Sequence, residues 1–275
     1  MKKNYSNTTK LNKNSKIKNG SLDLIIKITD TDFQYVIIDK IKILEIKNIK
    51  LKSFNTIDQK INLIKEIIDD NSVLKNKKWK STKISILSSK FTLIPKPFFR
   101  RKDCDLYLKY VSSYQDKKEK IIFHKHNKLG FYNVFSLDKK IYKFFNKFFN
   151  KNNIFHEGSA LIEGFYKTII NNKKSFFIYF DDDIIHILLF ENKLLVYYNI
   201  FLIKEDSYLK YIFLIIKEMK LSQEKMKIII SGNNLKVHLD KLKRYFSKIE
   251  ILSYNDFKLK INENNFISLL FNNNL

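Results

Sequence analysis

The sequence predicts an α/β protein in which one unit, a mixed five-stranded sheet with flanking helices, is used twice. The prediction starts from Phe176–Ile203, where three runs of aromatic and aliphatic residues are separated by Asp181–Asp183 and by Glu191–Lys193. Each run has the length of a strand, and each break has the length and polar composition of a hairpin turn. A less apolar copy, Leu22–Leu51, begins the first half. Both stretches therefore predict a three-stranded antiparallel meander.

The first half follows its meander with a helix and two more strands. Alternate residues from Leu22 to Ile28 are apolar, which is the period of a half-buried strand. Thr56 or Asp58 caps a helix whose isoleucines recur at spacings of three and four, so that they form one apolar stripe. The predicted elements are strands 22–29, 33–39 and 42–51, a helix that ends near 69–71, and strands 82–88 and 90–94.

An insertion after the fourth strand distinguishes the first half from the second. Pro95 and Pro97 take the chain out of any strand ladder, because proline lacks the backbone N–H donor. From here the sequence predicts a helix 98–111, strands 118–126 and 131–137, a helix from Asp138 to Phe149, a short strand 154–156, and a helix 160–170 that Ser159 caps.

The second half begins after a polar link at residues 171–174. Its meander is followed by a helix 208–220 with a cap at Asp206 or Ser207, a strand 227–231 closed by Gly232, a helix 234–246, a strand 248–252, and a helix or strand 266–271. Both halves thus have the order β-β-β-α-β-α-β. The predicted domains are a disordered basic tail at residues 1–20, an N-terminal lobe at 21–172 and a C-terminal lobe at 173–275.

The chain of 275 residues carries a formal net charge of +24, from 52 basic and 28 acidic residues. Such a charge ordinarily indicates a nucleic acid or an anionic membrane as partner. Here nearly all the cations are Lys, and the enriched residues (Lys, Asn, Ile, Phe and Tyr) have codons rich in A and T. We interpret the charge as mainly compositional, the product of an A/T-rich genome of the kind that reduced bacterial symbionts carry. Arg, which nucleic-acid proteins prefer, occurs only at Arg100, Arg101 and Arg244.

The location that the sequence favours is the cytoplasm. A single cysteine, Cys104, excludes an internal disulfide and fits a reducing compartment. No apolar run approaches the ~20 residues that span a bilayer. The basic N-terminal segment lacks the apolar stretch of a secretory signal, and we interpret it as a solvated tail.

Several short motifs resemble the DUF3822 family of Bacteroidetes proteins. They are FTLIPKPFF at Phe91–Phe99, FYNVFSL at Phe131–Leu137, FHEGSALI at Phe155–Ile162, KLLVYYNIFLIKEDSYLKY at Lys193–Tyr211, and the strand Ile228–Gly232. The order of elements also resembles the ribonuclease-H-like half that actin-like ATPases use twice, with the last strands added in parallel through right-handed crossovers. The resemblance implies a duplicated ribonuclease-H-like fold, similar to actin-like and pilus-assembly ATPases, without the ATPase activity.

The turns that would face phosphate argue against nucleotide binding. Actin-like ATPases hold phosphate with a glycine-containing hairpin in each half, because only Gly lets backbone N–H groups approach the oxygens closely. The equivalent turns, residues 28–32 and 180–184, contain no Gly, and the second has three carboxylates that repel phosphate unless Mg²⁺ intervenes. The resemblance thus implies a vestigial nucleotide cleft between the lobes, with no cofactor. Its candidate residues are Asp30, Thr31, Asp181, Asp182, Asp183 and Gly232.

No catalytic residue and no metal site is predicted. The carboxylates available to a two-metal nuclease lie mostly in predicted turns, where Asp is favoured for its own backbone hydrogen bonds. His124 and His126 share a strand face, but no third ligand accompanies them, and we interpret them as exposed edge residues. Cys104 lies between Asp103 and Asp105, which raise the pKa of a thiol and argue against a nucleophile.

These observations favour a non-catalytic scaffold or assembly factor, derived from an actin-like ATPase, with an unidentified protein partner. Two alternatives stay open. One is a nucleotide-binding actin-like ATPase with divergent phosphate loops, which would use ATP and Mg²⁺. The other is a basic RNA- or DNA-binding protein that uses the Lys-rich surface, and its binding would fall steeply with salt.

Overall fold

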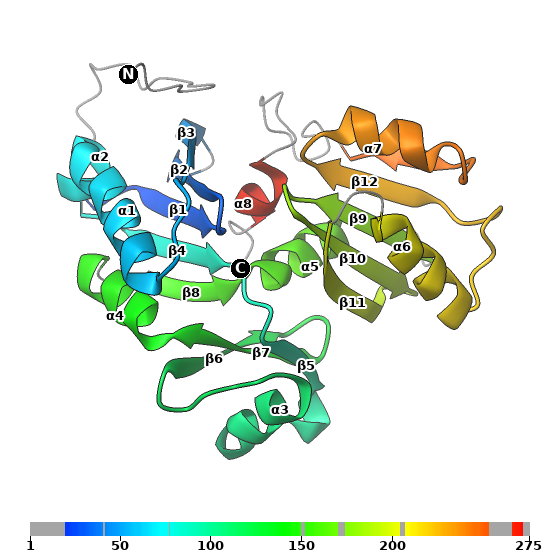
Figure 1. Cartoon of the computed structure of the whole chain (residues 1–275), viewed down its shortest axis with the longest axis horizontal. Helices are drawn as coiled ribbons and strands as arrows, with labels where there is room; N and C mark the ends of the chain where they lie inside the picture. The colour runs from blue at the N-terminus through cyan, green and yellow to red at the C-terminus, as the bar shows by residue number, and fades with distance from the viewer. Residues whose placement is uncertain are drawn as a thin grey trace. The chain divides into compact units, whose positions relative to one another are not determined.

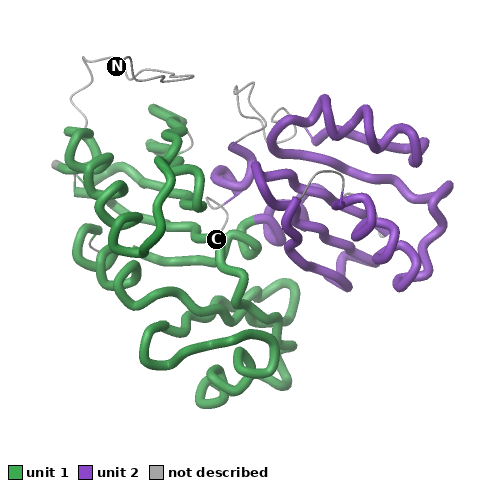
Figure 2. The backbone as a smooth tube through the Cα atoms, in the orientation of Figure 1, with its two compact units in different colours: residues 1–160, 275 green, residues 161–274 purple. Residues whose placement is uncertain are grey.

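A computed structural model describes residues 20–40, 42–76, 78–149, 152–169, 174–203, 207–252 and 266–271. The chain divides into two compact units, residues 1–160 with 275 (unit 1) and residues 161–274 (unit 2), shown in Figure 2. Each unit contains a mixed five-stranded sheet, which confirms the predicted duplication. The lobe boundary at residues 172 and 173 stays a prediction, and the N-terminal tail lies outside the described residues.

Unit 1 has a sheet with the strand order β3-β2-β1-β4-β8 (Figure 1). The first three strands form the predicted antiparallel meander, and β4 and β8 continue the sheet in parallel, as predicted. The strands are β1 (Asp23–Ile28), β2 (Asp32–Asp39), β3 (Lys42–Lys50), β4 (Ser81–Ile86) and β8 (Asn152–His156). The helices are α1 (Ile57–Asp70), α2 (Ser72–Asn76), α4 (Lys139–Phe148) and the beginning of α5 (Glu157–Thr168).

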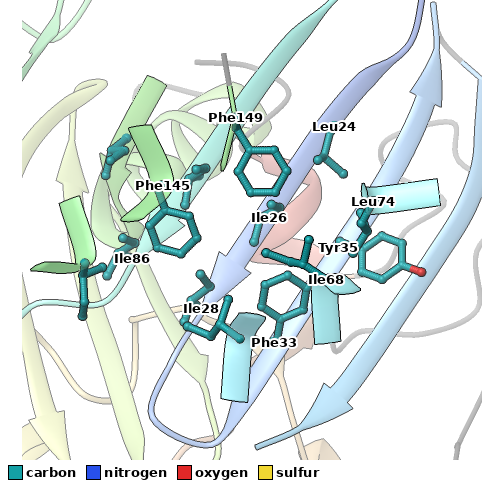
Figure 3. Packing of buried hydrophobic residues seen from close by; sticks show 14 of the residues in the cluster. Leu24, Ile26, Ile28, Phe33, Tyr35, Ile68, Leu74, Ile86, Phe145 and Phe149 are labelled. Carbon is teal, nitrogen blue, oxygen red and sulfur yellow. The ribbon is translucent and has the colours of Figure 1, made fainter. Parts of the chain in front are cut away.

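Helices α1, α2 and α4 cover one face of this sheet with apolar side chains. On β1 that face consists of Leu24, Ile26 and Ile28, which pack with Ile68 of α1 and Phe145 of α4 (Figure 3). Full burial of one such side chain stabilises the fold by about 1.5–3 kcal/mol. The alternation that predicts the strand therefore also defines the core face.

Two helices begin where their capping residues predict. The Thr56 hydroxyl accepts a hydrogen bond from the Gln59 N–H at 3.2 Å, and the Gln59 side chain accepts one from the Thr56 N–H, which completes a capping box at α1. Asp138 accepts a hydrogen bond from the Lys140 N–H at 2.7 Å at the start of α4. Each cap is worth about 1 kcal/mol.

The insertion forms a three-stranded sheet in the order β5-β7-β6, with α3 packed on one face. The predicted helix 98–111 is wrong in its first half, where two 3₁₀ turns precede α3. The Tyr107 hydroxyl donates to the Phe98 carbonyl at 2.7 Å and accepts from the Arg100 N–H at 2.9 Å, which keeps Arg100 extended. The elements are β5 (Phe91–Pro95), α3 (Cys104–Val111), β6 (Glu119–His126) and β7 (Phe131–Asp138).

Helix α5 begins at Glu157, so the predicted cap at Ser159 is wrong. The residue before the helix does the capping, because His156 Nδ1 accepts a hydrogen bond from the Gly158 N–H at 3.0 Å. Ser159 is fully buried within the first turn. Its hydroxyl is therefore available to side chains of the insertion.

Unit 2 repeats the sheet order as β11-β10-β9-β12-β13 (Figure 1). Helices α6 (Ser207–Glu218) and α7 (Leu235–Leu242) pack on one face, and the buried helix α8 (Ile267–Phe271) contributes Ser268, whose Oγ lies 3.0 Å from the Tyr179 hydroxyl. A Cβ on Gly164 would lie 2.0 Å from the Phe271 ring, so α5 requires glycine there. The strands are β9 (Ser175–Phe180), β10 (Ile184–Glu191), β11 (Leu194–Leu202), β12 (Ile228–Gly232) and β13 (Ile249–Ile251).

The two meanders share their register as well as their strand order. The Thr29 N–H donates to the Asp32 carbonyl at 3.0 Å in unit 1, and the Asp181 N–H donates to the Ile184 carbonyl at 2.9 Å in unit 2. Both outer ladders, β2 with β3 and β10 with β11, contain a bulge at the same relative position. The meanders therefore align residue by residue without a gap.

Candidate functional site

The β1–β2 turn of unit 1 contains the predicted site residues Asp30 and Thr31. The Thr29 hydroxyl accepts hydrogen bonds from the N–H groups of Thr31 at 3.2 Å and of Asp32 at 3.0 Å. These are the N–H groups that a phosphate-binding turn presents to its ligand. Neither Asp30 nor Thr31 has a positive φ, so the turn adopts its conformation without glycine.

The acidic side chains of this turn are paired with lysines from neighbouring elements. Asp30 Oδ1 accepts a hydrogen bond from Lys60 Nζ of α1 at 2.6 Å. Asp32 is buried, and its Oδ2 accepts from Lys50 Nζ of β3 at 3.0 Å and from the Thr31 hydroxyl at 2.7 Å. The negative charge of the turn is therefore balanced by side chains of unit 1 itself.

The β9–β10 turn of unit 2 brings Asp181 and Asp182 together beside Asn233, the residue after Gly232. Asp181 Oδ1 accepts a hydrogen bond from the Asp182 N–H at 3.1 Å. Asn233 Nδ2 donates to Asp182 Oδ1 at 2.7 Å and lies 3.4 Å from Asp181 Oδ1. Asp183 is exposed. As in unit 1, a side-chain oxygen accepts the hydrogen bond of a turn N–H group. The carboxylates around the turn would repel an anionic ligand.

Gly232 is required by the close approach of β12 to β9. Its φ is +108°, and a Cβ on it would lie 1.9 Å from the carbonyl oxygen of Phe180. The same carbonyl accepts a hydrogen bond from the Asn233 N–H at 2.7 Å. Packing within unit 2 therefore accounts for this glycine. A cleft shared by the unit 1 and unit 2 site residues stays a prediction.

A buried ion pair on the second face of the unit 1 sheet was missed by the sequence reasoning. Lys27 Nζ of β1 lies 2.8 Å from Oε1 of Glu157, and the side chains are 1% and 0% exposed. Gln34 and Ser85, which flank Lys27 on the neighbouring strands, are also buried. Leaving one charge of such a pair uncompensated costs about 3–5 kcal/mol. The available signal was a lysine inside an apolar strand and a carboxylate directly after another strand.

His126 is buried, so its predicted exposure is wrong. His126 Nε2 lies 3.1 Å from Ser159 Oγ, and Asn133 Nδ2 donates to the same oxygen at 3.0 Å. A serine beside an imidazole has the composition of a nucleophile with its base. All three side chains are fully buried, so a substrate does not reach the hydroxyl. The contacts instead fasten β6 and β7 of the insertion to α5.

A cavity of about 610 Å³ lies in unit 1 between the edge strand β3 and helices α1 and α2, and none of the predicted site residues lines it. Glu45, on its wall, accepts a hydrogen bond from the Tyr35 hydroxyl at 2.8 Å and contacts Lys47 Nζ at 2.8 Å. Asn71 Nδ2 donates to the same hydroxyl at 2.7 Å. Burial, and then the Glu45 carboxylate, raise the pKa of Tyr35 far above its ordinary value, so the phenol stays protonated. The cavity therefore has a fixed polar wall.

In the described ranges, no group of three or more His, Cys, Asp or Glu side chains is arranged to hold a metal ion. None of the helices in the same ranges is long and apolar enough to cross a membrane.

The sequence matches a family model described as "Protein of unknown function (DUF3822)" over residues 11–249, most of the chain. The chain belongs to the DUF3822 family. This confirms the resemblance drawn from the short motifs. None of the curated proteins matches the DUF3822 sequence.

Solved structures similar to this DUF3822 chain have the actin-like fold. One is a protein of Bacteroides thetaiotaomicron VPI-5482, described as having an actin-like ATPase fold and unknown function. It is 19% identical, with a TM-score of 0.78, and the match covers 92% of this chain and 96% of that one. Another belongs to the PilM–PilN type IV pilus biogenesis complex, with 8% identity, a TM-score of 0.61, and 90% and 96% covered. The DUF3822 chain therefore has the duplicated ribonuclease-H-like, actin-like ATPase fold that its sequence predicts.

Proposed function

We propose that this chain is a non-catalytic scaffold or assembly factor of the bacterial cytoplasm, with an actin-like fold that does not use nucleotide. The observation that carries the proposal is the occupancy of the turn N–H groups. The Thr29 hydroxyl accepts hydrogen bonds from two of these N–H groups in unit 1, and the Asp181 carboxylate accepts one in unit 2. A phosphate would have to displace these side chains before it could accept hydrogen bonds from the same three N–H groups.

The charges around the turns support the same proposal. Asp30 is compensated by Lys60, and Asp32 by Lys50, so these lysines are engaged with carboxylates of unit 1. In unit 2 the turn presents carboxylates, with the neutral Asn233 amide as a donor. A nucleoside triphosphate would meet negative charge at this second turn, which raises the free energy of binding unless a cation intervenes.

A protein partner is part of the proposal. The PilM–PilN structure is, by its description, a complex from type IV pilus biogenesis, which is an example of this fold in an assembly of proteins. The cavity between β3 and α1 adds a concave surface of the size that ligand sites in proteins have. We assign the Lys excess to an A/T-rich genome of a Bacteroidetes symbiont, and not to a nucleic-acid partner.

The test is a thermal-shift titration of the full chain with ATP and ADP in the presence of Mg²⁺, beside equal concentrations of tripolyphosphate. A ligand at 100 times its Kd stabilises the folded state by about 2.7 kcal/mol, which raises Tm measurably. We expect no rise that is specific to nucleotide. A rise with ATP but not with tripolyphosphate would show that nucleotide binds and would favour the ATPase alternative instead. An equal rise with both would report anion binding by the Lys-rich surface, and salt-dependent binding of generic RNA would then test the nucleic-acid alternative.

A further inference from the structure

Strand β11 is an edge of the unit 2 sheet and carries no charged residue. Its sequence is LLVYYNIFL, in which Leu194 and Leu202 are each 60% exposed and Val196 is 43% exposed. An edge strand presents open N–H and C=O groups, and a long apolar one is a template for pairing with another chain. Among the described residues no strand pairs with the outer side of β11, so this edge combines exposed apolar side chains with a backbone that no described strand covers.

Strand β3 shows that the chain protects the equivalent edge of unit 1. It holds the same sheet position, has the same length and carries the same bulge, but its sequence is KILEIKNIK. Lys42 stands where unit 2 has Leu194, and Lys50 where unit 2 has Leu202. Charges at such positions disfavour pairing with a further strand. Because the chain is rich in lysine throughout, composition does not explain why β11 has none.

The backbone groups that β11 directs away from β10 belong to Tyr198, Ile200 and Leu202. The Ile203 N–H donates to the Asp183 carbonyl of the β9–β10 turn at 2.7 Å. Because the N–H and C=O groups of successive residues point to opposite sides of a strand, the groups of odd-numbered residues after the bulge point toward β10. Asn199 Oδ1 accepts a hydrogen bond from the Ile200 N–H at 2.8 Å, so this N–H points out of the sheet and the Asn199 side chain must release it when a second strand pairs there. From the bulge to the end of β11, every second residue therefore directs its backbone N–H and C=O groups away from β10.

We propose that β11 pairs antiparallel with β11 of a second copy, so that the two unit 2 sheets become one continuous sheet across a two-fold axis at Asn199. This register places Leu202 opposite Val196 of the second copy and Ile200 opposite Tyr198 of the second copy. Asn199 then lies opposite Asn199 of the second copy. A strand that pairs antiparallel with its own copy is related to it by a two-fold axis, and about Asn199 the residues 196–202 meet one another with no charged side chain among them. Such a contact closes as a dimer.

Salt gives this contact a signature. Each copy has a formal net charge of +24, so two copies repel one another, and salt screens the repulsion. Dimerisation through the uncharged strand is therefore expected to strengthen as salt rises. An acidic partner bound by the lysines would dissociate under the same conditions. The dimer does not depend on the proposed scaffold function.

The first experiment is sedimentation velocity of the full chain over a range of concentration and salt, for the wild type, Leu202→Lys and Leu214→Lys. Leu214 lies on α6 and is 46% exposed, so its variant makes the same chemical change away from the edge. We expect the wild type and Leu214→Lys to dimerise alike, and Leu202→Lys to weaken the dimer about tenfold or more. A cooperative thermal unfolding transition in each variant establishes that both fold.

The second experiment tests the register. Asn199→Cys, in a Cys104→Ser background, places two thiols across the axis, where the Cα atoms of directly opposed residues that are not hydrogen-bonded lie about 4.5 Å apart, within disulfide reach. Mild oxidation with copper phenanthroline is expected to give a covalent dimer. A wild type that stays monomeric at high salt, equal dimerisation of the two lysine variants, or failure of the cysteine variant to cross-link would each overturn the proposal.

Discussion

Strands β3 and β11 have the same place, length and bulge in their sheets, yet they expose different chemistry. In unit 1, Asp32 of β2 pairs with Lys50 across the ladder, and in unit 2 the equivalent pair is Ile184 with Leu202. One ladder accepts either pair, because register is set by the alternation of buried residues and by the turns. The fold therefore does not require the charges of β3. The difference between the two strands concerns whether each sheet edge disfavours or permits pairing with another strand.

The sheet faces that carry Lys27 in unit 1 and Tyr179 in unit 2 show the same contrast between charged and neutral side chains. Lys27 of β1 forms a buried ion pair with Glu157, whereas Tyr179, at the equivalent position of β9, contacts the Ser268 hydroxyl at 3.0 Å. Unit 1 uses charges where unit 2 uses neutral hydrogen bonds. Burying a neutral hydrogen-bonded pair costs less free energy than burying an ion pair, and so does removing one of its partners. Unit 1 is therefore expected to lose more stability than unit 2 when a single partner is removed.

The largest effect is expected at Gly232, where unit 2 has a close backbone approach and the equivalent residue of unit 1 is Ile86. Gly232→Ala is expected to destabilise the chain by about 4 kcal/mol or more, the upper end for single substitutions, because the added Cβ meets the Phe180 carbonyl at 1.9 Å. The free energy of unfolding is measured by urea denaturation, followed by far-UV circular dichroism.

Gly130→Ala is the matched control for that clash. Gly130 also has a positive φ, of +73°, but no atom lies within 4 Å of an added Cβ. Only the left-handed backbone penalty then applies, which is about 1–2 kcal/mol. Equal losses for the two alanine variants would show that the approach of β12 to β9 is not what selects glycine at 232.

The next effect concerns Lys27. Lys27→Met removes one member of the buried pair with Glu157 and is expected to cost about 3 kcal/mol. Tyr179→Phe, at the equivalent position of unit 2, removes one neutral hydrogen bond and is expected to cost about 1 kcal/mol. Urea denaturation of both variants measures the difference. If Lys27→Met is no more costly than Tyr179→Phe, the charged and neutral sheet faces are energetically alike.

The parts of the fold that the sequence predicts are those that depend on neighbours along the chain. Alternation indicated the first strand of unit 1, and apolar runs between polar turns indicated the unit 2 meander. Thr56 marked the start of α1 because its hydrogen bond is to a residue three positions away. The first half of the predicted helix 98–111 failed because Tyr107 holds Phe98 and Arg100 in another conformation. That contact is specific to the insertion and leaves no periodic trace.

The candidate site was predictable in position but not in its interactions. The absence of glycine from the turns is visible in the sequence, whereas the occupation of their N–H groups by Thr29 and Asp181 depends on side-chain conformation. The Lys27–Glu157 pair joins residues far apart in the sequence, so neither residue alone indicates the other. Gly232 was singled out for a ligand, and its geometry shows a steric requirement inside unit 2.

The smallest of the three main effects, after those at Gly232 and Lys27, is expected in the insertion, which unit 2 lacks, at Glu119 of β6. Burial raises the pKa of Glu119, but hydrogen bonds from Lys90, the Gln115 N–H and Ser136 outweigh it and hold the pKa below the ordinary value. Glu119→Gln is expected to cost about 1.5–3 kcal/mol at neutral pH, the range for hydrogen bonds to a charged group. Urea denaturation over a pH series measures it.

The pH series gives the sign of this effect. Because the pKa of Glu119 is lower in the folded chain than in the unfolded one, the folded state binds fewer protons. The stabilisation is complete above the unfolded value of about 4.3 and is lost as pH falls through the folded value. The gap between wild type and Glu119→Gln should therefore close in acid. Asp105→Asn on α3 is the matched control: its pKa is also lowered, chiefly by the hydrogen bond from Lys109, but the pair is exposed and screened, so we expect no measurable gap at any pH. A gap for Glu119→Gln that persists unchanged in acid would mean that packing, and not the carboxylate charge, stabilises this part of unit 1.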